Sequence, residues 1–114
     1  MTPTRIVKTI SERIRNRSGG TLGLYYQGKG HAVLPISVKR SGFQAQISVY
    51  DSNIPNTIQF VDVNLQTNTW SYRSVNEDGS VALNWSGENS GCLDLIAPST
   101  RRSQQVKTLS FSMP

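Results

Sequence analysis

The sequence predicts an α+β fold in which one N-terminal amphipathic helix packs on an antiparallel sheet. Apolar residues recur at helical spacing within the first seventeen positions, and two adjacent glycines follow them. Beyond the glycines, short β-prone segments are separated by turn-forming residues. One helix followed by a series of short strands is typical of an antiparallel α+β domain. With 114 residues and no internal repeat or linker, the chain is expected to form a single domain, residues 1–114.

The helix is predicted to span roughly residues 3–17. Thr2 is placed to cap its N-terminus, and Pro3 suits the first turn because no backbone N–H is needed there. The helix is expected to end at Gly19-Gly20, since glycine adopts the left-handed conformation without strain. Its apolar face is formed by Ile6, Val7, Ile10 and Ile14.

Two β-prone runs, residues 31–38 and 43–50, are predicted to form a hairpin around the polar stretch Lys39-Arg40-Ser41-Gly42. If the chain folds about Ser41, His31 falls opposite Asp51, with Cβ atoms about 5 Å apart. We therefore predict that the imidazole lies within hydrogen-bond reach of the carboxylate. Asn53 is the alternative partner if the register shifts by one or two residues. A histidine oriented by a carboxylate is half of a catalytic triad.

The remaining alternation predicts further strands separated by loops or turns. The loops include residues 27–30, 52–56, 76–79 and 86–91. Strands are expected at residues 21–26, 57–63, 69–74, 81–85, 92–96 and 106–111.

The net charge of +5 is concentrated in the helix, because five of the twelve basic residues lie in the first seventeen positions. A solvated polar face is the favoured interpretation, and nucleic-acid binding is less favoured since no recognition motif accompanies the charge. No cofactor or metal is expected, and the single cysteine, Cys92, excludes an intramolecular disulfide framework. No segment is apolar enough for a membrane span or a signal peptide, so we expect a soluble chain.

Three segments carry a resemblance to a known family: GHAVLP at 30–35, VYDSNIP at 49–55 and NTWSY at 68–72. Together with the preceding helix, their order resembles the C-terminal half of papain-like cysteine peptidases, in the branch of the bacteriocin-processing peptidases and their bacterial relatives. The resemblance covers roughly residues 3–75. It implies a papain-like lobe in which His31 is the catalytic base and Asp51, or Asn53, orients it.

In that family the nucleophilic cysteine begins a helix in the N-terminal half, and this chain shows no such segment. The resemblance therefore implies a His/Asp lobe that is inactive alone and hydrolyses peptides only when a cysteine-bearing half is supplied. Cys92 follows His31 in the wrong order, and is expected to be a small packed side chain. The alternatives are a non-catalytic β-rich interaction module and, less favoured, a small basic nucleic-acid-binding domain.

Two expectations concern packing. Trp70, Tyr72 and Trp85 are expected in the core or on a sheet face, with Trp70 as a candidate shield for the His31–Asp51 pair. An exposed apolar surface is also expected, covered by a second copy or by a cysteine-bearing partner across the His31 face. Its candidate residues are Leu22, Leu24, Val33, Phe43 and Ile47.

Overall fold

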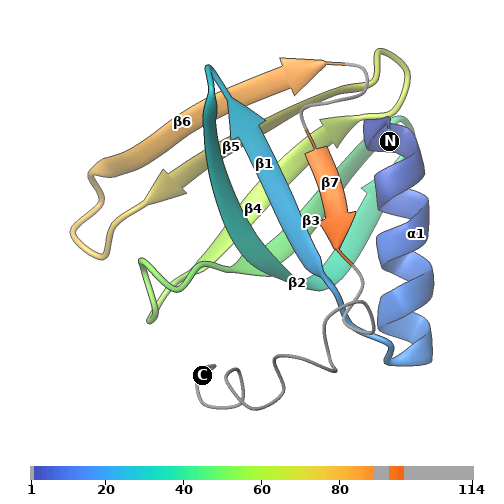
Figure 1. Ribbon diagram of the computed structural model, residues 1–114, viewed down its shortest axis with the longest axis horizontal. Helices are drawn as coiled ribbons and strands as arrows, with labels where there is room; N and C mark the ends of the chain where they lie inside the picture. The colour runs from blue at the N-terminus through green and yellow to red at the C-terminus, as the bar shows by residue number, and fades with distance from the viewer. Residues whose placement is uncertain (1, 89–92, 97–114) are drawn as a thin grey trace.

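The computed structural model describes residues 2–88 and 93–96, which form one helix and one antiparallel sheet (Figure 1). The α+β class predicted from the sequence is confirmed. The strand order is β6-β5-β4-β3-β2-β1-β7, so consecutive strands pair from β1 to β6 and β7 adds to the free edge of β1. The elements are α1 (Pro3–Asn16), β1 (Thr21–Tyr26), β2 (Lys29–Ser41), β3 (Gln44–Tyr50), β4 (Ile58–Asn64), β5 (Thr69–Val75), β6 (Val81–Glu88) and β7 (Leu93–Ile96).

The helix begins as predicted and ends slightly earlier than expected. The Thr2 hydroxyl accepts a hydrogen bond from the Arg5 backbone N–H, and Pro3 opens the first turn. At the other end the left-handed residue is Arg17, with φ 57°, and not a glycine. The Ser18 N–H bonds to the Arg13 carbonyl at 2.9 Å, which closes the helix end before the glycines are reached.

The sheet curls into a half-barrel, and the core fills its concave side (Figure 1). Helix α1 lies against this inner face and contacts β2, β4 and β7. At the far side of the curl, β6 approaches β1, where the rings of Tyr26 and Trp85 stack with centroids 5.7 Å apart. The buried apolar core comprises Ile6, Val7, Ile10, Leu22, Leu24, Val33, Ala45, Ile47, Val49, Val61, Val63, Trp70, Tyr72 and Leu93.

This curl overturns the expected apolar surface. Leu22, Leu24 and Ile47 are fully buried, and Val33 is 3% exposed. Only Phe43, at 59% exposure, lies on the surface as expected. The reason is that the inner faces of the curled strands and the helix cover one another, whereas a flat sheet would leave one face open. The apolar residues that are exposed on β2 and β4 are Leu34, Ile36, Ile58 and Phe60.

The β2–β3 hairpin forms, but its register differs from the predicted one. Ser41 pairs with Gln44, so the turn consists of Gly42 and Phe43 and is not centred on Ser41. The register then shifts between Pro35 and Ser37, and Leu34 pairs with Tyr50. A β-bulge of this kind adds one residue to one strand and bends it. Asp51 therefore follows the end of β3. Its position aligns with Val33 on β2, which is two residues away from His31.

That bulge determines which face Asp51 occupies. Side chains alternate between the two faces of a strand, so a shift of two positions preserves the face and a shift of one reverses it. Without the bulge, the ladder at the turn would align Asp51 with Leu34, whose side chain points outward. With the bulge, Asp51 falls in line with Val33 and shares the inner face with His31.

The other strands lie close to their predicted positions. β1 matches residues 21–26, whereas β2 begins at Lys29 because only Gln27 and Gly28, both with positive φ, form the preceding turn. β6 continues to Glu88, so part of the predicted loop 86–91 is strand. Cys92 and the predicted strand 106–111 lie outside the described residues. Within the described part, no helix is long and apolar enough to cross a membrane.

Candidate functional site

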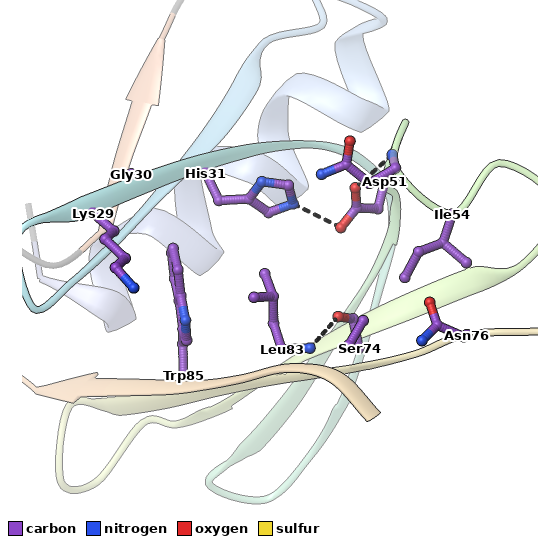
Figure 2. Close-up of a pocket in the computed structure, with 11 residues that line it drawn as sticks. Lys29, Gly30, His31, Asp51, Ile54, Ser74, Asn76, Leu83 and Trp85 are labelled. Carbon is purple, nitrogen blue, oxygen red and sulfur yellow. Dashed lines mark hydrogen bonds and ion pairs between the residues drawn. The ribbon is translucent and has the colours of Figure 1, made fainter. Parts of the chain in front are cut away.

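His31 and Asp51 meet on the inner face of the half-barrel (Figure 2). The imidazole Nε2 lies 2.7 Å from the Asp51 Oδ2 atom. The Asp51 side chain is 1% exposed and the His31 side chain 14% exposed, so the ring retains an edge open to solvent. The predicted contact between the two side chains is present, although the two residues are not directly opposite each other in the ladder.

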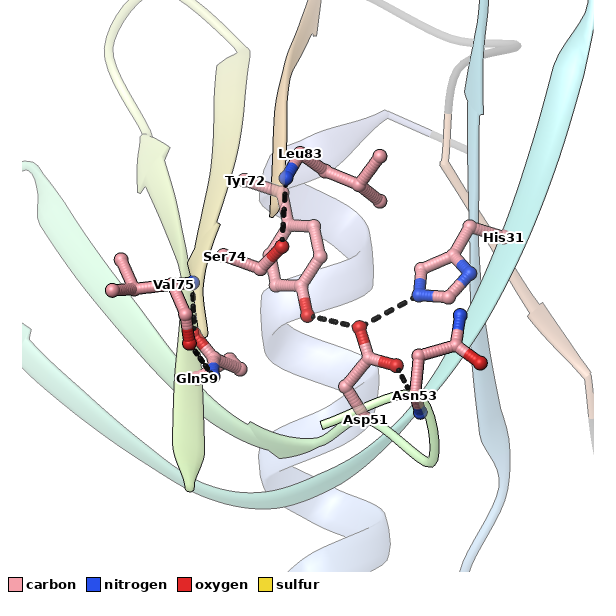
Figure 3. A network of polar contacts seen from close by, with 8 residues as sticks. All are labelled: His31, Asp51, Asn53, Gln59, Tyr72, Ser74, Val75 and Leu83. Carbon is pink, nitrogen blue, oxygen red and sulfur yellow. Dashed lines mark hydrogen bonds and ion pairs between the residues drawn. The ribbon is translucent and has the colours of Figure 1, made fainter. Parts of the chain in front are cut away.

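Asp51 is held by two further hydrogen bonds (Figure 3). The Tyr72 hydroxyl donates to Oδ2 at 2.6 Å, and the Asn53 backbone N–H donates to Oδ1 at 3.0 Å. The second bond is local, because an aspartate at the start of a turn accepts from the N–H two residues later. The first bond comes from β5, whose alternate residues Trp70, Tyr72 and Ser74 are buried on the inner face. The carboxylate thus receives donors from three separate segments.

These bonds set the charge of the carboxyl group. Burial by itself raises the pKa of Asp51, but the hydrogen bonds from Tyr72, His31 and Asn53 outweigh burial and lower it below its ordinary value. Burial and the adjacent carboxylate raise the pKa of Tyr72, so its hydroxyl stays protonated as a donor. Asp51 is therefore an ionised acceptor at neutral pH.

An ionised Asp51 fixes the tautomer of a neutral His31. Because the carboxylate can only accept, Nε2 carries the proton and Nδ1 carries the lone pair. Among the described residues, no hydrogen-bond partner is found for Nδ1. A histidine in this state is a base that takes up a proton at Nδ1 while Asp51 stabilises the resulting imidazolium.

Two aromatic rings hold the imidazole in place. Tyr72 lies at a centroid distance of 6.2 Å with planes 29° apart, and Trp85 lies edge-on at 6.2 Å. Trp85 in turn stacks on Tyr26, which fixes it between β6 and β1. The core placement of Trp70 and Tyr72 is confirmed, and Trp85 is partly buried against that core. Trp85 is the indole ring that lies beside the His31–Asp51 pair. Trp70, the residue expected to shield the pair, makes no ring contact with His31 within the described part of the chain.

A pocket of about 490 Å³ lies in front of the pair (Figure 2). Its rim carries exposed polar side chains, including Lys29, Asn53 and Asn76, and its wall is formed by Leu83 and Trp85. Ser74 also lines the pocket, but it is fully buried and its hydroxyl accepts from the Leu83 N–H at 3.1 Å. Ser74 is therefore engaged in holding β5 to β6.

The described residues bring the imidazole of His31 and the carboxylate of Asp51 together, and no thiol lies among them. Asn53 lines the pocket and contacts Asp51 through its backbone, so Asp51 occupies the position of the histidine partner and Asn53 supports it. Sequence reasoning missed the roles of Tyr72 and Trp85. Their alternation on predicted strands placed them on a sheet face, but nothing in the sequence indicates which cross-sheet partner each one meets.

Comparison with known proteins adds no relative to this picture: no family model, no curated protein and no solved structure matches the chain. Within residues 2–88 and 93–96, no group of three or more histidine, cysteine, aspartate or glutamate side chains is arranged to hold a metal ion.

The low pKa of Asp51 predicts that acid destabilises the fold. A carboxyl group whose pKa is lower in the folded than in the unfolded chain stabilises the fold above the unfolded pKa, whose ordinary value is 3.8. That stabilisation is lost as the pH falls through the folded pKa.

Urea denaturation between pH 6 and pH 2 should therefore show that the free energy of unfolding falls with pH. Asp51→Asn should make the free energy of unfolding depend less on pH. An unchanged slope in Asp51→Asn would show that other carboxyl groups carry the effect. Asp78→Asn is the comparison variant. Hydrogen bonds with Ser80 lower the pKa of the Asp78 carboxyl group, so this variant shows how much of the acid dependence comes from a carboxyl group other than Asp51.

Proposed function

We propose that this chain is the histidine- and aspartate-bearing lobe of a papain-like cysteine hydrolase that acts on peptide bonds. The observation that carries the proposal is the hydrogen bond between His31 Nε2 and the buried Asp51, which directs the lone pair of the ring to Nδ1. The resemblance of residues 30–35 and 49–55 to the family supports the same roles, with His31 as base and Asp51 as orienting residue.

In this proposal the chemistry needs a thiol that approaches His31 from the pocket. Nδ1 accepts the thiol proton, and the resulting thiolate attacks the carbonyl carbon of the peptide bond. Asp51 stabilises the imidazolium, while Tyr72 and Asn53 hold the carboxylate in position. His31 then donates its proton to the departing amine. Trp85 restricts water on one side of the ring, which strengthens the ion pair.

The thiol is proposed to come from a cysteine-bearing lobe, supplied either by another chain or by a further segment of the same protein. The pocket offers a suitable contact surface, because its rim residues Lys29, Asn53, Asn76 and Ala82 are all exposed. By itself, the lobe described here supplies a base but no oxyanion hole next to a thiolate. We therefore expect it to be inactive on peptides in isolation.

The proposal is tested by asking whether His31 activates a thiol placed in its pocket. Asn53 and Leu83 both line the pocket, and the Asn53 bond to Asp51 uses only the backbone. Asn53→Cys and Leu83→Cys, each combined with Cys92→Ser, would be alkylated with iodoacetamide from pH 5 to pH 9. In at least one of them, we expect alkylation at pH 6 to be about tenfold faster than for an ordinary exposed thiol, because an adjacent imidazolium stabilises the thiolate.

Two controls separate activation from exposure. Ser71→Cys with Cys92→Ser places a thiol on the outer face of β5, away from His31, and should titrate as an ordinary cysteine. Adding His31→Ala should abolish the activation at the pocket positions and leave the Ser71→Cys thiol unchanged. If both pocket thiols react at the same rate with and without His31, the proposed role of His31 as a base is wrong.

A further inference from the structure

A second and larger hollow lies on a different part of the surface. This groove has a volume of about 780 Å³ and runs between α1 and the turn that joins β2 to β3. It shares no lining residue with the pocket at His31. One wall is a stripe of helix residues at helical spacing, Arg5, Lys8, Glu12 and Arg15, and the other carries Arg40 and Phe43.

The walls of the groove are held together by hydrogen bonds. The Leu65 N–H donates to the Phe43 carbonyl at 2.7 Å, which ties the hairpin turn to the chain beyond β4. The Thr4 hydroxyl lies 3.2 Å from the Leu65 carbonyl and 2.6 Å from Asn68 Oδ1, so the first turn of α1 is anchored to the same segment. Because the walls of the groove are already fixed, the protein loses little conformational entropy when a ligand binds, and this favours affinity.

The charge of the groove is strongly positive. Arg5, Lys8, Arg15 and Arg40 are all exposed, and Glu12 is the one acidic residue among the groove's lining. Within the described part of the chain, none of these cations forms an ion pair. Cations gathered around a concave surface attract an anionic partner and raise its rate of association.

The floor and rim restrict the chemistry of that partner. Val7 and Leu65 form aliphatic parts of the lining, and Phe43 stands at the rim with 59% of its surface exposed. A single aromatic ring offers little stacking surface for successive nucleotide bases. Aliphatic side chains of a peptide match the aliphatic lining. From Arg5 to Arg15 the helix rises about 15 Å, which an extended segment of about five residues spans.

We propose that this groove binds an extended acidic segment of a polypeptide in which Asp or Glu residues alternate with aliphatic residues. The carboxylates pair with Arg5, Lys8, Arg15 and Arg40, and the aliphatic side chains contact Leu65 and Phe43. The site is independent of the pocket at His31, so it stands whether or not the chain is part of a hydrolase.

The test is fluorescence anisotropy with a labelled eight-residue peptide of alternating Glu and Leu, titrated with the whole chain. We expect saturable binding that weakens with salt, and binding about tenfold weaker in Arg5→Glu/Lys8→Glu. This variant is expected to fold, because a glutamate at position 5 lies three residues after the Thr2 cap, where it stabilises a helix start. Phe43→Ala should weaken binding by about threefold.

The matched control is Arg73→Glu, which makes the same charge change as the single variant Lys8→Glu but at an exposed position on the outer face of the sheet. It should bind the peptide within about twofold of the original chain, because Arg73 lies on β5, which contributes no residue to the groove. A peptide with Gln for Glu and one with Ser for Leu should both bind more weakly. Equal loss in Lys8→Glu and Arg73→Glu, or tighter binding of a fifteen-nucleotide oligothymidylate than of the peptide, would overturn the proposal.

Discussion

Asp51→Ala is expected to lower the free energy of unfolding by about 3–5 kcal/mol, because it removes a buried carboxylate and leaves several hydrogen-bond donors without an acceptor. The side chain is 1% exposed and accepts hydrogen bonds from His31, Tyr72 and Asn53. Its removal leaves the Tyr72 hydroxyl, which is fully buried, without an acceptor. The loss is measured as a lower midpoint in urea denaturation at pH 7, with an unchanged slope.

Two variants show whether the loss comes from this network. Asp62→Ala removes an exposed aspartate from the outer face of β4, and should change stability by at most about 0.5 kcal/mol. Asp51→Asn retains one acceptor oxygen and should be intermediate. If Asp51→Ala were as stable as Asp62→Ala, the described network would contribute nothing to the fold.

Tyr72→Phe is expected to lower the free energy of unfolding by about 1.5–3 kcal/mol, the range for a hydrogen bond to a charged group. The substitution keeps the buried ring, which packs in the core and against the His31 ring, and removes only the hydroxyl that donates to Asp51. With one donor fewer, the pKa of Asp51 rises toward its ordinary value, because burial then opposes fewer stabilising bonds. The acid-induced loss of stability should therefore begin at a higher pH than in the original chain.

The pH dependence separates this effect from a simple packing defect. Urea midpoints of Tyr72→Phe are compared with those of Val61→Ala, a core variant on β4 that does not touch Asp51 through a hydrogen bond. Val61→Ala should shift the midpoint equally at all pH values, whereas Tyr72→Phe should shift it most in the acid range. A parallel shift in both variants would mean that Tyr72 does not tune Asp51.

The elements of the fold follow from local patterns in the sequence. The spacing of Ile6, Val7 and Ile10 predicts the helix, and its cap at Thr2 is where the sequence indicates. The strands follow from alternation, with small errors at their ends. The helix ends at Asn16 because hydrogen bonds close its last turn around Arg17. The glycines at 19 and 20 predict that the helix ends nearby, but they do not show this exact position.

The curl of the sheet did not follow from those patterns. Alternation shows that Leu22 and Leu24 lie on one face of their strand, but it does not show whether that face is covered or which residues of other strands share it. The structure buries them because α1 and the curled strands close over the inner face. Curvature depends on bulges and on contacts between distant strands, such as Tyr26 with Trp85.

The contact between His31 and Asp51 depends on both the local sequence and the tertiary structure. From the sequence alone, two β-prone runs and a short turn were enough to place an imidazole and a carboxylate near each other. The predicted register was wrong, and the contact exists because the bulge between Pro35 and Ser37 returns Asp51 to the inner face. Tertiary structure alone decided that Tyr72 donates to Asp51 and that Trp85 lies against His31.

Local sequence determines which residues form strands and how their side chains alternate between the two faces of each strand. The partner of a side chain across a curled sheet depends on the register and bending of every strand between them.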